Sequence, residues 1–260
     1  MAESRDSTGN TFVVAIGISL LCSILVSAAA VLLKPAQEAN QARYRHKIVL
    51  EVAGLYDADT DIEKTFSAID ARLVELASGD YETTLDARSF DAAAALSDPE
   101  LSVDIPPQFD LAGIQRRATI APVYLVRKGG EVQQVILPVY GKGLWSTMYG
   151  YLSVSADGHT VQGLRFYEHA ETPGLGDQIE RDEWLASWRG KRLFGEQGEP
   201  RLEVIRGKVA GGADAAYQVD GLSGATLTGR GVTRLLQYWT GPHAFGPYLE
   251  KLAQEAAGDD

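Results

Sequence analysis

One uncharged stretch near the start of the chain limits what the rest of it can be. Residues 11–33 read TFVVAIGISLLCSILVSAAAVLL and contain no charged side chain. As an α-helix at about 1.5 Å per residue this stretch is roughly 34 Å long, which matches a hydrocarbon core of about 30 Å. A cleaved signal peptide is the alternative, because Ser27 and Ala29 offer small residues near a cleavage site. The stretch is longer than a signal core of about 7–15 residues and follows a segment without excess positive charge, so we expect a retained anchor.

The charges beside this stretch do not fix its orientation. Four basic residues follow it, Lys34, Arg43, Arg45 and Lys47, and counting them would place the following domain in the cytoplasm. The same rule weakens where a long domain follows, because such domains cross largely regardless of charge. Local charge therefore leaves the side of the membrane open.

Composition excludes several classes of function. A net charge of −11 argues against nucleic acid, which is bound by clustered Lys and Arg. Cys22 is the only cysteine and lies in the apolar stretch, so neither an internal disulfide nor a cysteine-ligated iron–sulfur cluster is possible. The four histidines are widely separated and show no metal-ligand spacing, so we expect no metal site.

The spacing of apolar and turn residues in the rest of the chain predicts an α+β domain. Pro35 is expected to end the membrane helix, and residues 61–78 have helical apolar spacing with Gly79 as the stop. Alternating residues then predict two β-hairpins, which turn at 129–130 and 156–159. A short helix near 178–188, strands at 201–208 and 215–221 and helices at 227–239 and 247–256 should follow. Strands and helices that occur in separate runs indicate the α+β class. We divide the chain into an anchor (1–34), a helical and irregular membrane-proximal region (35–117) and a main domain (118–260).

The most informative segment is 220–229, DGLSGATLTG, which reads as a strand end, a turn of small residues and a helix start. Glycine lets the backbone approach a ligand closely, and free amides at a helix N-terminus suit a phosphate. Hydroxyl groups of Ser223, Thr226 and Thr228 lie at the same place. Composition alone favours an ordinary helix cap.

The pattern Asp-x-x-Ser-Gly-Ala-Thr in 220–226 resembles the flavinylation motif of the FMN-binding domain family. That resemblance implies that Thr226 is joined to the phosphate of FMN by a phosphoester bond, which a dedicated flavin transferase makes. The cofactor-binding residues that it implies here are Asp220, Ser223, Gly224, Ala225, Leu227 and Thr228.

Two further segments strengthen the resemblance. Residues 171–176, ETPGLG, are similar to the loop that packs on the flavin in that family, which implies roles for Glu171, Thr172, Gly174 and Leu175. Residues 141–150, GKGLWSTMYG, lack the spacing of a phosphate-binding P-loop and instead resemble a segment of the C subunits of Na+-translocating NADH:quinone oxidoreductases. There Trp145 can stack on the flavin ring, while Ser146 and Thr147 can reach its polar edge. A tryptophan between strands is also a common core residue.

The similarity to this C-subunit family extends over nearly the whole chain, including 33–40, 53–56 and 245–249. It implies a covalent-FMN carrier that takes electrons from an iron–sulfur centre and passes them to another flavin subunit on the way to quinone. It also implies a complex of six subunits in the bacterial inner membrane, a single-pass anchor and a periplasmic domain. We expect a basic residue near the phosphate, either Arg206 or Lys208.

The sequence carries no G-x-G-x-x-G after a strand, so NADH should bind to another subunit. No catalytic acid–base pair or nucleophile triad stands out, which favours electron relay over substrate turnover. The alternatives are the G subunit of an Rnf-type ferredoxin:NAD oxidoreductase, an anchored FMN-binding sensor or accessory protein, and an interaction domain in which the motif is only a helix cap.

Overall fold

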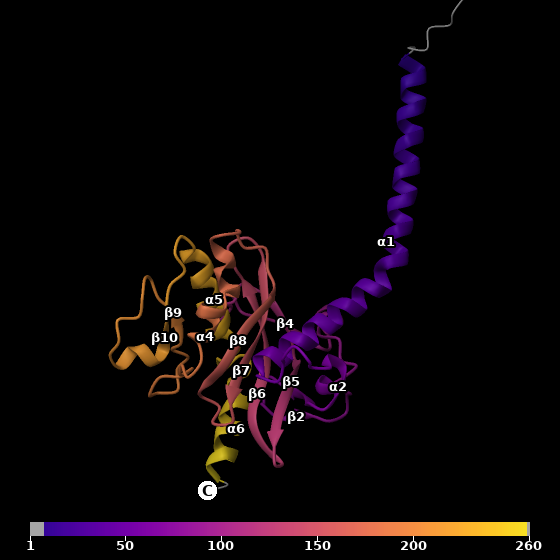
Figure 1. The fold of residues 1–260 in the computed structure, drawn as a ribbon. Coiled ribbons are helices and arrows are strands. Elements are labelled where there is room, and N and C mark those ends of the chain that lie inside the picture. The colour runs from indigo at the N-terminus through magenta and orange to yellow at the C-terminus, as the bar shows by residue number, and fades with distance from the viewer. Residues whose placement is uncertain (1–7, 259–260) are drawn as a thin grey trace, which may run out of the picture. The chain divides into compact units, whose positions relative to one another are not determined.

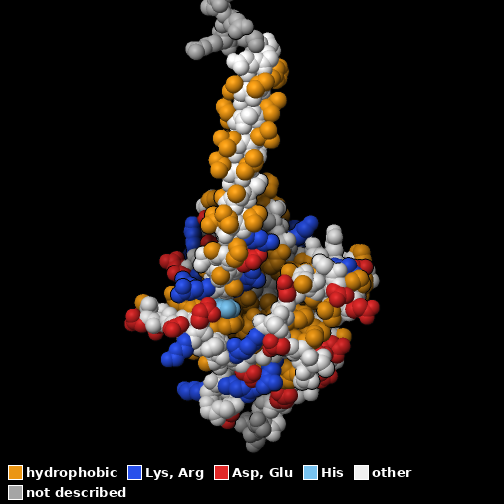
Figure 2. All heavy atoms as spheres, turned by 90° about the vertical axis from the view of Figure 1, so that its right-hand side faces the viewer, with side chains coloured by type: hydrophobic (Ala, Val, Ile, Leu, Met, Phe, Trp, Pro, Cys, Tyr) orange, Lys and Arg blue, Asp and Glu red, His pale blue; other side chains and the backbone are white. Residues whose placement is uncertain are grey.

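The structure is a computed structural model that describes residues 8–258. Its first helix, α1 (Thr8–Val52), contains the whole uncharged stretch, and its apolar side chains from Phe12 to Leu33 are exposed (Figure 2). Of the helices in the described part, α1 is the one long and apolar enough to cross a membrane. The prediction that Pro35 ends the helix is wrong, because α1 continues for several turns beyond it.

The described chain divides between Arg45 and His46 into an amino-terminal unit and a compact unit that reaches the C-terminal end. The second unit begins with the last turns of α1 and includes both early strands, β1 (Asp70–Glu75) and β2 (Tyr81–Glu82). The boundary that we expected at residue 117 therefore does not separate two units in the structure, since β1 pairs directly with β5 (Ile120–Lys128).

A six-stranded antiparallel sheet forms the centre of this unit (Figure 1). Its order is β2-β1-β5-β6-β7-β8, with β6 at Glu131–Lys142, β7 at Thr147–Ser155 and β8 at Val161–Glu168. Both predicted hairpins, β5–β6 and β7–β8, are confirmed. The link between β6 and β7 is short and contains Trp145, so this residue lies at one end of the sheet.

The predicted helix over 61–78 is wrong in its second half. Helix α2 (Ile62–Ser67) begins near the predicted start, where the Asp61 carboxylate caps it by accepting a hydrogen bond from Lys64 N, but it ends after six residues. The chain then enters β1, where Leu73 and Val74 are buried. Pairing of the whole of β1 with residues 120–125 of β5 satisfies the backbone of this segment and outweighs its helical spacing.

Two cores lie on opposite sides of the sheet. The smaller core combines the end of α1, including Leu50, with Ile69, Ile136 and Tyr151. The larger core brings α5 (Thr226–Trp239) and α6 (Gly246–Gly258) against the other face of the strands. Both helices confirm the predicted closing helices.

Short elements complete the fold. The predicted helix near 178–188 is present as two pieces, a 3-10 helix η1 (Gly176–Glu180) and α4 (Asp182–Ala186). The predicted strands at 201–208 and 215–221 are present only as the short β9 (Glu203–Val204) and β10 (Gln218–Val219). These two strands pair in parallel, and β10 follows the 3-10 helix η2 (Ala213–Tyr217). The acidic region before residue 116 is mostly irregular, with α3 (Ala92–Ser97) and β3 (Ser102–Asp104), and β4 (Arg116–Ala118) follows it.

Candidate functional site

Helix α5 reaches the site because two glycines allow its close approach to the sheet. A Cβ on Gly231 would lie 2.7 Å from Lys142 O, and a Cβ on Gly141 would lie 2.6 Å from Leu235 Cβ. At the far end of the helix, Trp239 Nε1 donates to Tyr140 O at 2.6 Å. These contacts hold α5 along β6, with the N-terminus of the helix near the β6–β7 link.

The three segments singled out in the sequence meet at this end of the fold. The β6–β7 link and the loop after β8 are joined by four hydrogen bonds. Leu144 N and Trp145 N donate to Glu171 Oε1 at 2.9 and 3.1 Å. Trp145 Nε1 donates to Thr172 Oγ1 at 2.9 Å, and Ala170 N donates to Ser146 Oγ at 2.8 Å.

The loop after β8 is also bound to the 220–226 turn. Gln178 Nε2 donates to Leu175 O at 2.6 Å and to Ser223 O at 3.0 Å. Gly224 has φ of +75°, and a Cβ there would lie 2.8 Å from Leu175 Cδ2. The turn therefore needs glycine for its backbone conformation, and Leu175 Cδ2, the end of an exposed side chain, packs closely over it.

The N-terminus of α5 is open to solvent. Thr226 is its first residue and is exposed, and the preceding Ala225 has no side chain that can cap the helix. No acidic residue lies in the first turn. Free amides and the positive end of the helix dipole at this point suit a phosphate group.

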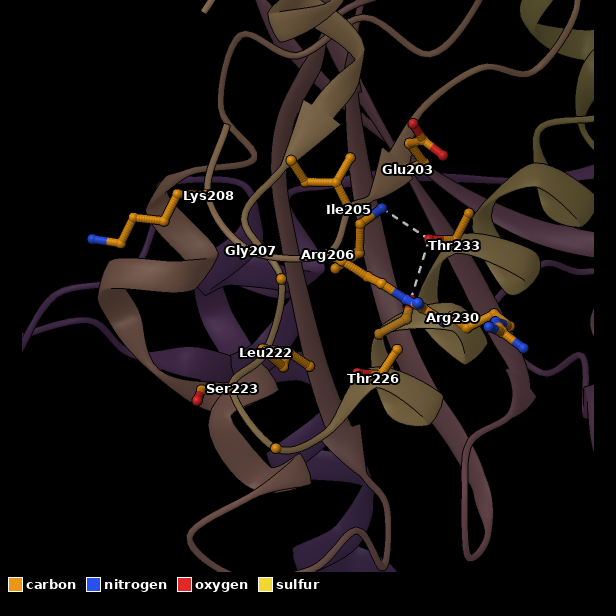
Figure 3. A pocket seen from close by; sticks show the side chains of 14 residues that line it. Glu203, Ile205, Arg206, Gly207, Lys208, Leu222, Ser223, Thr226, Arg230 and Thr233 are labelled. Carbon is orange, nitrogen blue, oxygen red and sulfur yellow. Dashed lines mark hydrogen bonds between the residues drawn. The ribbon is translucent and has the colours of Figure 1, made fainter. Parts of the chain in front are cut away.

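A pocket of about 710 Å³ lies beside this helix start. It is lined by Thr226, Arg230 and Thr233 of α5, by Ser223 of the turn and by the 203–208 segment. In Figure 3 the side chain of Arg206 extends across the pocket towards the first turns of α5, whereas Lys208 points away. Of the two basic residues that the sequence left open, Arg206 is placed to meet an anion here.

Exposed apolar side chains lie on the same three segments. Trp145 is 69% exposed, and Leu144, Leu175 and Leu227 are exposed to about half. Large apolar groups left uncovered on a rigid support favour a bound planar ring or a partner surface over a core role. The interpretation of Trp145 as a core residue is therefore wrong.

Other predicted site residues do not face the pocket but form hydrogen bonds that hold the site together. Thr228 is fully buried and its hydroxyl donates to Glu171 Oε2, so neither group faces outward. Asp220 Oδ1 accepts from Val209 N at 2.7 Å, and its carbonyl accepts from Trp184 Nε1 at 2.9 Å, which fixes the entry to the turn. The hydroxyl of Ser146 is used within the protein.

Some residues of the site were not predicted from the sequence. Arg230 and Thr233 line the pocket because they lie one and two helical turns after Thr226, a spacing that could have indicated them. Gln178 and Leu144 carry no sequence signal of their own, since their place depends on contacts between distant segments.

These residues together can hold a phosphorylated planar cofactor, with an exposed hydroxyl, open helix amides and a guanidinium on one side and apolar side chains on the other. The FMN-binding domain family matches residues 143–241, which contain the 171–176 and 220–229 segments and residues 143–150 of the first segment. The class of protein is therefore one with an FMN-binding domain and, ahead of it in the chain, an apolar helix long enough to cross a membrane.

The particular family follows from whole-length relatives. The chain is 42% identical to the C subunit of the Na+-translocating NADH-quinone reductase of Yersinia pestis over 98% of its own length and 96% of the relative. It is 44% identical to the same subunit of Neisseria meningitidis over 97% of both chains. The crystal structure of Shewanella oneidensis NqrC superposes with a TM-score of 0.76 at 34% identity, covering 83% of this chain and 99% of that one. The chain belongs to the family of C subunits of the Na+-translocating NADH-quinone reductase.

Proposed function

We propose that this chain carries FMN covalently on Thr226 and relays electrons within a Na+-translocating NADH:quinone oxidoreductase. The observation that carries the proposal is the placement of the Thr226 hydroxyl. Thr226 is an exposed residue at an uncapped helix N-terminus and lines the same pocket as Arg206. A phosphate esterified to this oxygen would lie at the amides of the first turn of α5, where the helix dipole favours negative charge.

The side chains divide the work of holding the cofactor. Arg206 neutralises the phosphate, with Ser223 lining the same pocket. Trp145, Leu175 and Leu227 provide apolar surface for the isoalloxazine ring, and the hydroxyls of Thr172 and Thr147 lie on the segments next to it. Asp220, Glu171 and Thr228 support these groups from behind through their hydrogen bonds.

The bound FMN supplies the redox chemistry, while the protein sets its position and surroundings. We infer that electrons arrive from an iron–sulfur centre of a partner subunit and leave to the flavin of another subunit on the way to quinone. An exposed ring site on a rigid sheet suits such a relay, since both partners must approach the cofactor closely.

We also propose partners and a membrane location for this chain. The other subunits of a membrane complex of six are its permanent partners, and a flavin transferase acts on Thr226 during maturation. The uncharged part of α1 spans the inner membrane once, and the flavin domain faces the periplasm. The length and exposed apolar surface of α1 support the anchor.

The experiment is a Thr226→Ala variant in the assembled complex. We expect loss of NADH-driven quinone reduction with NADH oxidation by an artificial acceptor preserved, because the NADH site lies on another subunit. Thr228→Ser is the control, since it keeps the buried hydroxyl and the attachment site. Full quinone reduction by the Thr226→Ala complex would refute the relay.

A further inference from the structure

Glu171 is the most enclosed charged side chain near the site. It is only 4% exposed, yet its carboxylate forms no ion pair with Lys, Arg or His within residues 8–258. Its charge is instead met by three donors, the backbone N–H groups of Leu144 and Trp145 and the hydroxyl of Thr228. A buried carboxylate is tolerated when such donors surround it, and losing one of them is expensive.

The segment that carries Glu171 is itself fixed. Glu171 N donates to His169 Nδ1 at 3.2 Å, and His169 Nε2 lies 3.0 Å from Glu180 Oε1. A hydrogen bond from this amide to Nδ1 leaves the ring proton on Nε2, which lies close to the Glu180 carboxylate but outside hydrogen-bond geometry. The backbone amide of Glu171 is therefore held by the His169 ring.

Two glycines allow the chain to pack closely against the Glu171 side chain. A Cβ on Gly143 would collide with Glu171 Oε1. A Cβ on Gly176 would lie 2.8 Å from Glu171 Cβ and 2.9 Å from Thr228 Oγ1. Gly176 is therefore required by close packing on this pair, since its φ is not in the left-handed region.

The Glu171 carboxylate connects the turn that contains Trp145 to the first turn of α5. One oxygen holds the backbone of Trp145, whose ring is also held by Thr172 although the side chain is 69% exposed. The other oxygen holds Thr228, two residues after Thr226 in the first turn of α5. An exposed indole fixed at both backbone and ring is organised for a surface contact, because packing does not hold it.

We propose that Glu171 is a positioning residue that holds the Trp145 turn in a fixed relation to the start of α5. This inference rests on the proposed function, because it assigns the indole to the flavin on Thr226. Glu171 does not contact the cofactor in this account. It sets the position of the apolar surface on which the ring lies.

Glutamine offers a close test of the geometry. In Glu171→Gln the amide oxygen can accept from Leu144 N and Trp145 N, and the amide nitrogen can donate to Thr228 Oγ1 once that hydroxyl turns to accept. Glu171→Ala removes all three bonds. Thr228→Val removes one bond at nearly constant volume, and Glu168→Ala, an exposed carboxylate at the end of β8, is the matched control.

The experiment uses the full chain in detergent with three readouts. Intact mass reports attachment to Thr226, visible circular dichroism reports the environment of the bound flavin, and amide hydrogen exchange at 144–145 reports the turn without any cofactor. We expect Glu171→Ala to keep the attached mass, lose most of the visible dichroism and exchange faster at 144–145. Glu171→Gln and Glu168→Ala should resemble the wild type, and Thr228→Val should lie between the two groups.

The outcomes separate this inference from the proposed function. Unchanged exchange and dichroism in Glu171→Ala would overturn the inference, as would a Glu171→Gln protein as damaged as Glu171→Ala. Absence of attached flavin from the wild type would contradict the proposed function instead, and the exchange experiment on the cofactor-free protein would still decide the role of Glu171. If Glu171→Ala does not fold, the milder pair Thr228→Val and Thr228→Ser decides it by the same readouts.

Discussion

Replacing Gly231 with alanine tests whether the close packing of α5 on β6 contributes to the free energy of unfolding of the domain. The new Cβ would lie 2.7 Å from Lys142 O and 3.2 Å from both Gly143 Cα and Met148 Cε. A backbone oxygen cannot rotate away, so the helix must move off the strand. Overpacking of this kind costs about 1–3 kcal/mol, whereas alanine gains about 1 kcal/mol over glycine in a helix interior.

Gly229→Ala is the matched control on the same helix. Its nearest contact is 3.1 Å from Val204 Cγ1, an atom of a side chain that can shift. The gain in helix propensity is the same, so the two variants differ mainly in what the methyl group meets. We expect Gly229→Ala to be between neutral and about 1 kcal/mol more stable than the wild type, and Gly231→Ala to unfold about 2 kcal/mol more easily than Gly229→Ala.

Guanidinium unfolding of the full chain in detergent, followed by tryptophan fluorescence, measures this difference. All four tryptophans lie in the second unit, so the signal reports the domain that contains α5. Equal midpoints for the two variants, or a Gly231→Ala protein more stable than the wild type, would refute the argument from close packing.

Three other changes have defined outcomes. Trp239→Phe leaves Tyr140 O without its donor and should lower the free energy of unfolding by about 1–3 kcal/mol in the same assay. Arg206→Gln should slow flavin attachment by about tenfold, because losing a charge-assisted hydrogen bond costs about 1.5 kcal/mol, while Lys208→Gln should not, as timed intact-mass measurements would show. Asp157→Ala should cost about 2 kcal/mol at neutral pH, since the carboxylate accepts several hydrogen bonds within the β7–β8 turn. Burial raises the pKa of Asp157, but those hydrogen bonds outweigh it and leave the pKa below its ordinary value, so the stabilisation should vanish as the pH falls through that lowered pKa.

The sequence predicted best where one local pattern decides the structure. Alternation along β5 to β8 and the turn at 129–130 determined both hairpins, and the apolar periodicity after Thr226 determined α5. It failed at β1, because the spacing of Leu73 and Leu76 suits a helix and only pairing with β5 makes it a strand. It also failed at Pro35, which α1 accommodates within the helix.

The candidate site also has parts that local sequence patterns predict and parts that they do not. Short motifs indicated Thr226, Trp145 and the loop at 171–176, since each depends on glycine, hydroxyl or aromatic residues in a fixed order. They did not separate outward-facing groups from supporting ones. Whether Glu171 or Thr228 faces a ligand depends on how three segments that are distant in sequence pack together. That packing cannot be predicted from local patterns in a single sequence.

The central claim is that FMN is joined to Thr226, and intact mass spectrometry of the denatured protein tests it most directly. The protein should be extracted from membranes after expression with an active flavin transferase, alongside Thr226→Ala and, as the neighbouring control, Thr228→Val. We predict that the wild type and Thr228→Val carry the mass of one FMN less one water, located on the peptide that contains Thr226, and that Thr226→Ala carries none. An unmodified wild type, with the transferase shown to be active on a control substrate, or a Thr226→Ala protein that retains the increment, would contradict the account.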